Sequence, residues 1–136
     1  MSRFAGSLDA NVLLRLLLND VQSQHKAAVT LLSNASGQLA VSDTAIIEVV
    51  FVLCGTTYNF TREQTVEAID GLMKLKEISC NSTLFDKALA LFVEHPSLSF
   101  EDCCLATYAH LNNAEPLWTF DKKLANQATS AKQLKV

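Results

Sequence analysis

Four acidic residues stand beside apolar segments of this 136-residue chain and could do chemistry together. They are Asp9, Glu48, Asp102 and Asp121. A carboxylate left ionised and unpaired in apolar surroundings costs on the order of several kcal/mol, so each group needs a cation or a shifted pKa. Because the chain has only 11 Lys and Arg residues, a shared divalent metal is the simplest partner. A metal held by carboxylates commonly serves reactions of phosphate esters.

Glu48 is the acid with the fewest structural alternatives. It is the only charged residue in segment 45–54, and it lies too far inside the expected helix to cap its start. Its remaining alternative is a buried salt bridge. Three short polar residues near the acids, Asn11, Thr44 and Thr119, could assist a metal site or act as ordinary cap and turn residues.

The other three acids each have a structural alternative. Asp9 and Asp121 directly follow apolar segments and could cap the helices that begin after them. Asp102 lies three residues after Ser99, which is the spacing of a capping box. However, apolar residues follow Asp102 at i+3, i+4 and i+7, and this pattern places it on an inward helical face.

Alternating apolar segments predict the elements that must position these residues. Strands are expected at residues 4–8, 38–41, 77–80 and 115–120, with a final edge strand at 133–136. Helices are expected at residues 10–18, 21–34 and 43–54, from the capping box Thr61–Gln64, from Ser82 to His95, after Ser99 and after Asp121. This order predicts one α/β domain over residues 1–136, with a central parallel sheet covered by helices on both faces.

In parallel sheets of this kind, ligands bind beyond the carboxyl ends of the strands. Asp9 and Asp121 each come directly after an expected strand. The predicted topology therefore favours a site at that edge of the sheet.

Composition and cysteine spacing exclude several classes of protein. The net charge of −3 argues against broad cationic attraction to nucleic acid, although a nuclease whose metals supply local positive charge is allowed. The four cysteines include no C-x-x-C pair, so we expect no zinc site and four free thiols in a reducing cytoplasm. The N-terminal apolar run lasts only seven residues, so no membrane span is expected.

Four sequence features occur in an order that carries a resemblance. They are Asp9-Ala-Asn-Val-Leu13, the lone Glu48, Phe100-Glu-Asp-Cys-Cys-Leu-Ala106 and Thr119-Phe-Asp-Lys-Lys-Leu124. Together they resemble the PIN-domain ribonucleases, most closely the VapC-like toxins of toxin–antitoxin pairs, over nearly the whole chain. The resemblance implies a three-layer α/β/α sandwich and Mg²⁺- or Mn²⁺-dependent cleavage of single-stranded or looped RNA.

The resemblance also implies roles and partners. The four acids match the acidic quartet that binds metal and performs catalysis, and Asn11 and Thr119 match accessory polar positions of the family. Asp9 and Asp102 would be the principal ligands, and the number of metals stays open. VapC-like proteins commonly form homodimers and are inhibited by a cognate antitoxin, so both partners are expected.

Three other functions are alternatives to a PIN-domain ribonuclease. An aspartyl-phosphate phosphatase would need a second acid two residues after Asp9, where this chain has Asn11. A receiver domain would need an acidic pair at the end of the first strand, where this chain has Ser7 and Leu8. The remaining alternative is a PIN-like domain that binds RNA or protein without cutting.

Overall fold

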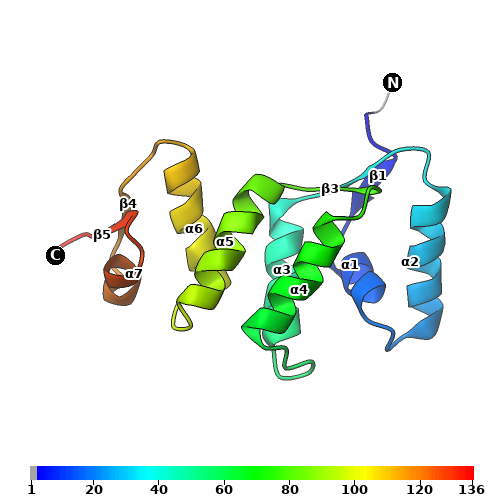
Figure 1. Ribbon diagram of the computed structural model, residues 1–136, viewed down its shortest axis with the longest axis horizontal. Coiled ribbons are helices and arrows are strands. Elements are labelled where there is room, and N and C mark those ends of the chain that lie inside the picture. The colour runs from blue at the N-terminus through cyan, green and yellow to red at the C-terminus, as the bar shows by residue number, and fades with distance from the viewer. Residues whose placement is uncertain (1–2) are drawn as a thin grey trace. The chain divides into compact units, whose positions relative to one another are not determined.

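The computed structural model describes residues 3–136, which form two compact units (Figure 1). Unit 1 extends to Asn81, and unit 2 is Ser82–Val136. The elements of unit 1 are β1 (Gly6–Leu8), α1 (Ala10–Leu17), α2 (Gln22–Asn34), β2 (Leu39–Val41), α3 (Asp43–Cys54), α4 (Arg62–Met73) and β3 (Ile78–Ser79). Those of unit 2 are α5 (Ser82–Glu94), α6 (Phe100–Leu111), β4 (Leu117–Thr119), α7 (Lys122–Gln127) and β5 (Ala131–Gln133).

The three strands of unit 1 form a parallel sheet in the order β1-β2-β3. Leu8, the last residue of β1, lies opposite Val41, the last residue of β2. Since both strands end in this register, the residues that follow them, Asp9 and Ser42, emerge at the same edge of the sheet. Helices α1 and α3 begin there.

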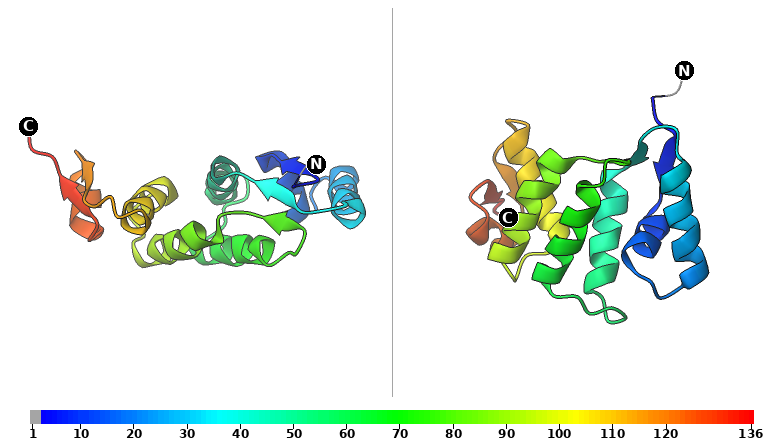
Figure 2. Two further views of the ribbon diagram at one scale, coloured as in Figure 1. Left: turned by 90° about the horizontal axis from the view of Figure 1, so that it is seen from above. Right: turned by 45° about the vertical axis from the view of Figure 1, so that its right-hand side comes forward.

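The helices of unit 1 pack as neighbours around this sheet. Helix α1 contacts both α2 and α3, and α3 runs beside α4 (Figure 2). The buried residues of α3 lie on one side of the helix and are Ala45, Ile46, Val49, Val50 and Leu53. The other side of α3 is exposed, and Phe51 there has an exposed fraction of 78%. Helix α3 is therefore buried on one side only, although its composition is apolar nearly all round.

Local hydrogen bonds fix the starts of several helices. Ser42 caps α3, because its side chain accepts a bond of 3.2 Å from the N–H of Ala45. The predicted capping box of α4 is complete: Thr61 Oγ1 accepts from the N–H of Gln64 at 3.0 Å, and Gln64 Oε1 accepts from the N–H of Thr61 at 2.9 Å. These bonds satisfy N–H groups that have no partner within the helix itself.

Unit 2 is built on an aromatic core. Helices α5 and α6 contact each other closely, and the buried residues of α5 include Phe85, Ala88, Leu89 and Phe92. The Phe100 ring of α6 stacks on Phe85 with centroids 6.0 Å apart and meets Phe92 edge-on at 5.3 Å. Strands β4 and β5 then pair in parallel, with Leu117 opposite Ala131.

The predicted fold class, α/β with parallel strands, is confirmed. The strands lie in two sheets, one in each unit, and the single-domain organisation over residues 1–136 stays a prediction. The edge strand predicted at 133–136 begins earlier, because Ala131 is the residue that pairs with β4.

Two further expectations concern the cysteines and membrane-spanning helices. None of the cysteines in residues 3–136 forms a disulfide. Over the same residues, no helix combines the length and the apolar character needed to cross a membrane.

Candidate active site

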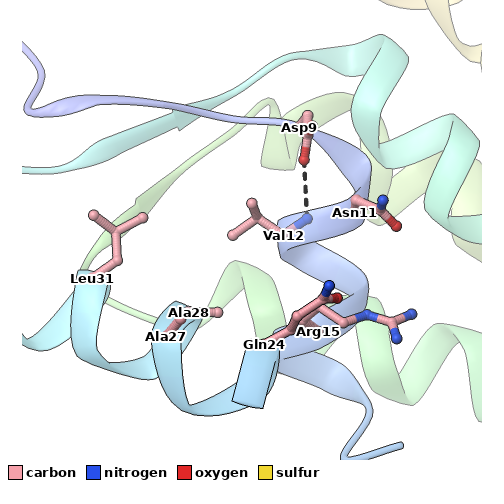
Figure 3. Close-up of a pocket in the computed structure, with 8 residues that line it drawn as sticks. All are labelled: Asp9, Asn11, Val12, Arg15, Gln24, Ala27, Ala28 and Leu31. Carbon is pink, nitrogen blue, oxygen red and sulfur yellow. Dashed lines mark hydrogen bonds between the residues drawn. The ribbon is translucent and has the colours of Figure 1, made fainter. Parts of the chain in front are cut away.

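Asp9 lies between β1 and α1 and caps the helix. Its Oδ1 accepts a hydrogen bond of 3.0 Å from the N–H of Val12 (Figure 3). The side chain is exposed, and its second oxygen, Oδ2, accepts no hydrogen bond from any residue that the structure describes. The capping interpretation of Asp9 is therefore confirmed, and one carboxylate oxygen remains available to a ligand.

Glu48 is exposed, so the prediction that it lies in buried apolar surroundings is wrong. It forms no hydrogen bond or ion pair with the residues described, which also removes the buried salt bridge as an explanation. The apolar neighbours that suggested burial point elsewhere, because successive side chains around a helix point in different directions. Val49 is fully buried, for example, while Glu48 faces solvent.

Asp9 and Glu48 nevertheless lie together, because both line the same two cavities of unit 1. Thr44 lines the first of these cavities, and Asn11 lines the second. The structure thus brings together four of the seven predicted site residues. All four offer oxygen atoms, the donors that suit Mg²⁺ and Mn²⁺ and that zinc favours less.

Asp102 lies in the first turn of α6 in unit 2. Its backbone N–H donates to Ser99 Oγ at 3.1 Å, so Ser99 caps the helix as predicted. Its carboxylate does not complete a capping box with the residues described. Ala106 and Ala109 on the predicted inward face are buried, but Leu105 is exposed. Asp102 is half-buried, which places it at the border of the buried face.

Asp121 caps α7 and is exposed. Its Oδ1 accepts hydrogen bonds from the N–H groups of Lys123 at 2.9 Å and Leu124 at 3.2 Å. Thr119 Oγ1 accepts from the N–H of Asp121 at 3.0 Å. The structural interpretations of both residues, cap and turn, are therefore confirmed, and Lys122 and Lys123 stand exposed beside the acid.

The predicted quartet is divided between the two units. Asp9 and Glu48 belong to unit 1, whereas Asp102 and Asp121 belong to unit 2, and the convergence of the two pairs on one metal stays a prediction. Within residues 3–136, no three or more His, Cys, Asp or Glu side chains form a group suited to hold a metal ion.

A cluster of Arg15, Asp20 and Tyr58 beside the acidic pair was not predicted from the sequence. Arg15 Nη1 pairs with Asp20 Oδ1 at 2.9 Å, Arg15 Nη2 donates to the Tyr58 hydroxyl at 3.3 Å, and that hydroxyl donates to Asp20 Oδ2 at 2.7 Å. The hydrogen bond from Tyr58 and the positive charge of Arg15 lower the pKa of the Asp20 carboxyl. The hydrogen bond to Tyr58 and the charge of Asp20 raise the pKa of Arg15. The acidic partner of Arg15 is therefore Asp20.

Residues 7–129 match the PIN domain family, so the chain belongs to that family. The match includes all four acids and extends over parts of both units. PIN domains are generally nucleases, that is, hydrolases of nucleic acid. No curated protein matches the chain significantly. The resemblance to PIN domains is therefore confirmed, and the VapC-like subtype remains a proposal.

Proposed function

We propose that this PIN domain is a metal-dependent endoribonuclease and the toxin of a toxin–antitoxin pair. The observation that carries the proposal is the position of Asp9 and Glu48. In a chain of a generally nucleolytic family, these two carboxylates line shared cavities, and Asp9 directly follows the first strand of a parallel sheet. Parallel α/β sheets place their ligands at such an edge.

The donor chemistry of these residues fits a hard divalent cation. Asp9 and Glu48 would hold Mg²⁺ or Mn²⁺ from unit 1, with Asn11 and Thr44 assisting, and Asp102 and Asp121 would complete the site from unit 2 with Thr119 nearby. When bound, such an ion lowers the pKa of a coordinated water and offsets negative charge on a phosphodiester.

The residues of the chain set two requirements for catalysis. Carboxylates that share a cavity repel each other and repel an RNA phosphate, so the acidic pair would need a bound cation before RNA could approach it. Lys122 and Lys123 are exposed beside Asp121 and are suited to contact the RNA backbone, because phosphate contacts supply most of the affinity for nucleic acid. The residues of this chain would thus hold the ion and orient the RNA strand.

The partners of the protein belong to the same proposal. RNA is the substrate, a cognate antitoxin is the inhibitor, and two copies of the chain form a homodimer in the cytoplasm. The order of the four motifs supports this VapC-like assignment. Large apolar side chains that are exposed on unit 1, such as Leu31 at 44% and Phe51 at 78%, support binding to other protein chains.

The decisive experiment measures cleavage of a pool of structured and unstructured RNAs by the full chain. We expect cleavage with Mg²⁺ or Mn²⁺, none with EDTA, and a loss on the order of 100-fold or more in Asp9→Asn. Asparagine preserves the helix cap while it removes the charge, so a folding defect is avoided. The matched control is Glu63→Gln, an exposed acid of the same unit, which should cleave like the wild type.

Two results would overturn the proposal. Equal cleavage by the wild type and Asp9→Asn would exclude the acidic site. Metal-independent binding of RNA without cleavage by the wild type would favour the alternative of a non-catalytic PIN-like binding domain.

A further inference from the structure

The cluster of Arg15, Asp20 and Tyr58, here called the Arg15 clamp, joins three separate segments of unit 1. Arg15 lies on α1, Asp20 lies between α1 and α2, and Tyr58 follows the end of α3. Arg15 and Tyr58 are 43 residues apart in sequence, so their hydrogen bond is a tertiary link between α1 and the segment after α3. The backbone carbonyl of Arg15 also lies 2.7 Å from Nδ1 of His25, which links α2 to the same point.

The Arg15 clamp adjoins the acidic pair. Arg15 and Tyr58 line the cavity that Asp9, Asn11 and Glu48 also line. Figure 3 shows the Asn11 amide and the Arg15 guanidinium on the same side of α1, directed away from Leu31 of α2. The clamp therefore bonds α1, which Asp9 caps, to the segment that follows α3, the helix that carries Glu48.

The geometry of Arg15 suits a structural link better than a contact with RNA. Its two terminal nitrogens are occupied by Asp20 and Tyr58, and its Nε is buried without a hydrogen-bond partner among the residues described. The side chain has an exposed fraction of only 12%. Turning the guanidinium toward a phosphate would break both bonds, and the carboxylate of Asp20 already balances its charge.

We propose that Tyr58 is a positioning residue whose hydroxyl, held by Arg15 and Asp20, sets the separation between Asp9 and Glu48 for metal binding. The link acts at the wall of the cavity that both acids line, where it adds to the direct packing of α1 against α3. Mg²⁺ demands near-ideal coordination geometry, so a small change in the spacing of two ligands weakens binding. Outer groups that orient ligands typically change metal affinity by about 10- to 100-fold.

The test measures Mn²⁺ binding to RNA-free protein by electron paramagnetic resonance, together with the Mg²⁺ dependence of cleavage. Tyr58→Phe keeps the ring and removes the hydroxyl, and we expect its Mn²⁺ dissociation constant to rise about 10-fold. Asp20→Asn should weaken binding in the same direction. The matched control is Tyr108→Phe, the other tyrosine of the chain, which is exposed on α6 and should bind Mn²⁺ like the wild type.

The outcomes separate this proposal from the proposed function on which it rests. If Asp9→Asn abolishes Mn²⁺ binding while both Tyr58→Phe and Asp20→Asn bind like the wild type, the positioning role is overturned and the metal site stands. A lowered melting temperature in Tyr58→Phe with unchanged Mn²⁺ affinity also overturns the positioning role, since the link would then be structural only. If Asp9→Asn binds Mn²⁺ like the wild type, the metal site fails and the positioning role fails with it.

Discussion

Thr119 and Asp121 together build the turn that starts α7. Thr119 Oγ1 accepts from the N–H of Asp121 at 3.0 Å, and Asp121 Oδ1 accepts from two N–H groups of the helix. Asp9 caps α1 in the same way, because its Oδ1 accepts a hydrogen bond from the N–H of Val12. A cap requires an oxygen acceptor, whereas a metal site requires negative charge, so substitution by asparagine separates the two roles.

The first prediction applies this separation to Asp121. Asp121→Asn should leave the free energy of unfolding within about 0.5 kcal/mol of the wild type, because asparagine caps as well as aspartate. Asp121→Ala should lower it by about 1 kcal/mol. Both variants should lose cleavage if the charge binds metal. Urea unfolding and RNA cleavage measure the two effects, and full cleavage by Asp121→Asn would remove Asp121 from the catalytic set.

The second prediction concerns Glu48. Because its side chain is exposed, an effect of its substitution on cleavage can be measured apart from an effect on folding. Glu48→Gln should change the free energy of unfolding by less than about 0.5 kcal/mol, because no partner among the described residues is lost. Cleavage should fall on the order of 100-fold if the carboxylate serves the metal site. Thermal unfolding and initial cleavage rates, compared with Glu63→Gln, test this. Unchanged cleavage in Glu48→Gln would limit the site to the other acids.

The third prediction concerns the pH dependence of stability through Asp20. The hydrogen bond from Tyr58 and the charge of Arg15 hold the pKa of Asp20 below its ordinary value of 3.8. Its contribution to stability is therefore fully present above the ordinary pKa and is lost as the pH falls through the lower folded value. Arg15 stays protonated throughout, so it adds no pH dependence in this range.

Urea unfolding of the wild type and Asp20→Asn at several pH values measures this contribution. The difference in the free energy of unfolding between the two proteins should be constant above the ordinary pKa and should shrink at lower pH. A difference that grows with acidification would show that the protonated form of Asp20 is the one stabilised by the clamp.

The fourth prediction concerns the aromatic core of unit 2. Phe85 is fully buried and stacks on Phe100. Phe85→Ala should lower the free energy of unfolding by about 3–5 kcal/mol, because it removes apolar contacts and leaves a cavity. Phe85→Leu should cost less than about 1.5 kcal/mol if the core repacks around it. Urea unfolding of these variants, with the exposed Phe51→Ala as control, gives the comparison. Equal losses at Phe85 and Phe51 would contradict the burial described.

Much of the secondary structure was predictable because it depends on local chemistry. Ser42, Thr61 and Ser99 each accept a hydrogen bond from an N–H three residues later, and these caps fix helix starts that the sequence shows directly. Strand β1 likewise ends at Leu8 as predicted, because the next residue, Asp9, caps the helix that follows. Family membership was also recognisable, because the four motifs around the acids occur in this chain in the order that carries the resemblance to PIN domains.

The environment of the site was harder to predict, because it depends on packing between distant segments. The composition of α3 suggested burial on all sides, but its neighbours cover only one side and leave Glu48 exposed. The bond between Arg15 and Tyr58 has no local signature, since the two residues are 43 positions apart. Strand β5 takes its register from β4 rather than from its own apolar residues, so its start at Ala131 was missed.

Under the proposed function, Asp9 and Asp121 each have two roles, because each caps a helix and would also bind the metal. A descendant that stopped cutting RNA would still need an acceptor at positions 9 and 121, and Asn, Ser or Thr would satisfy that need. Position 48 has no such requirement, because the Glu48 carboxylate forms no hydrogen bond or ion pair with the residues described. Under the proposed function, substitutions that accompany loss of cleavage should therefore appear first at Glu48, whereas positions 9 and 121 should change only to residues that keep an oxygen acceptor.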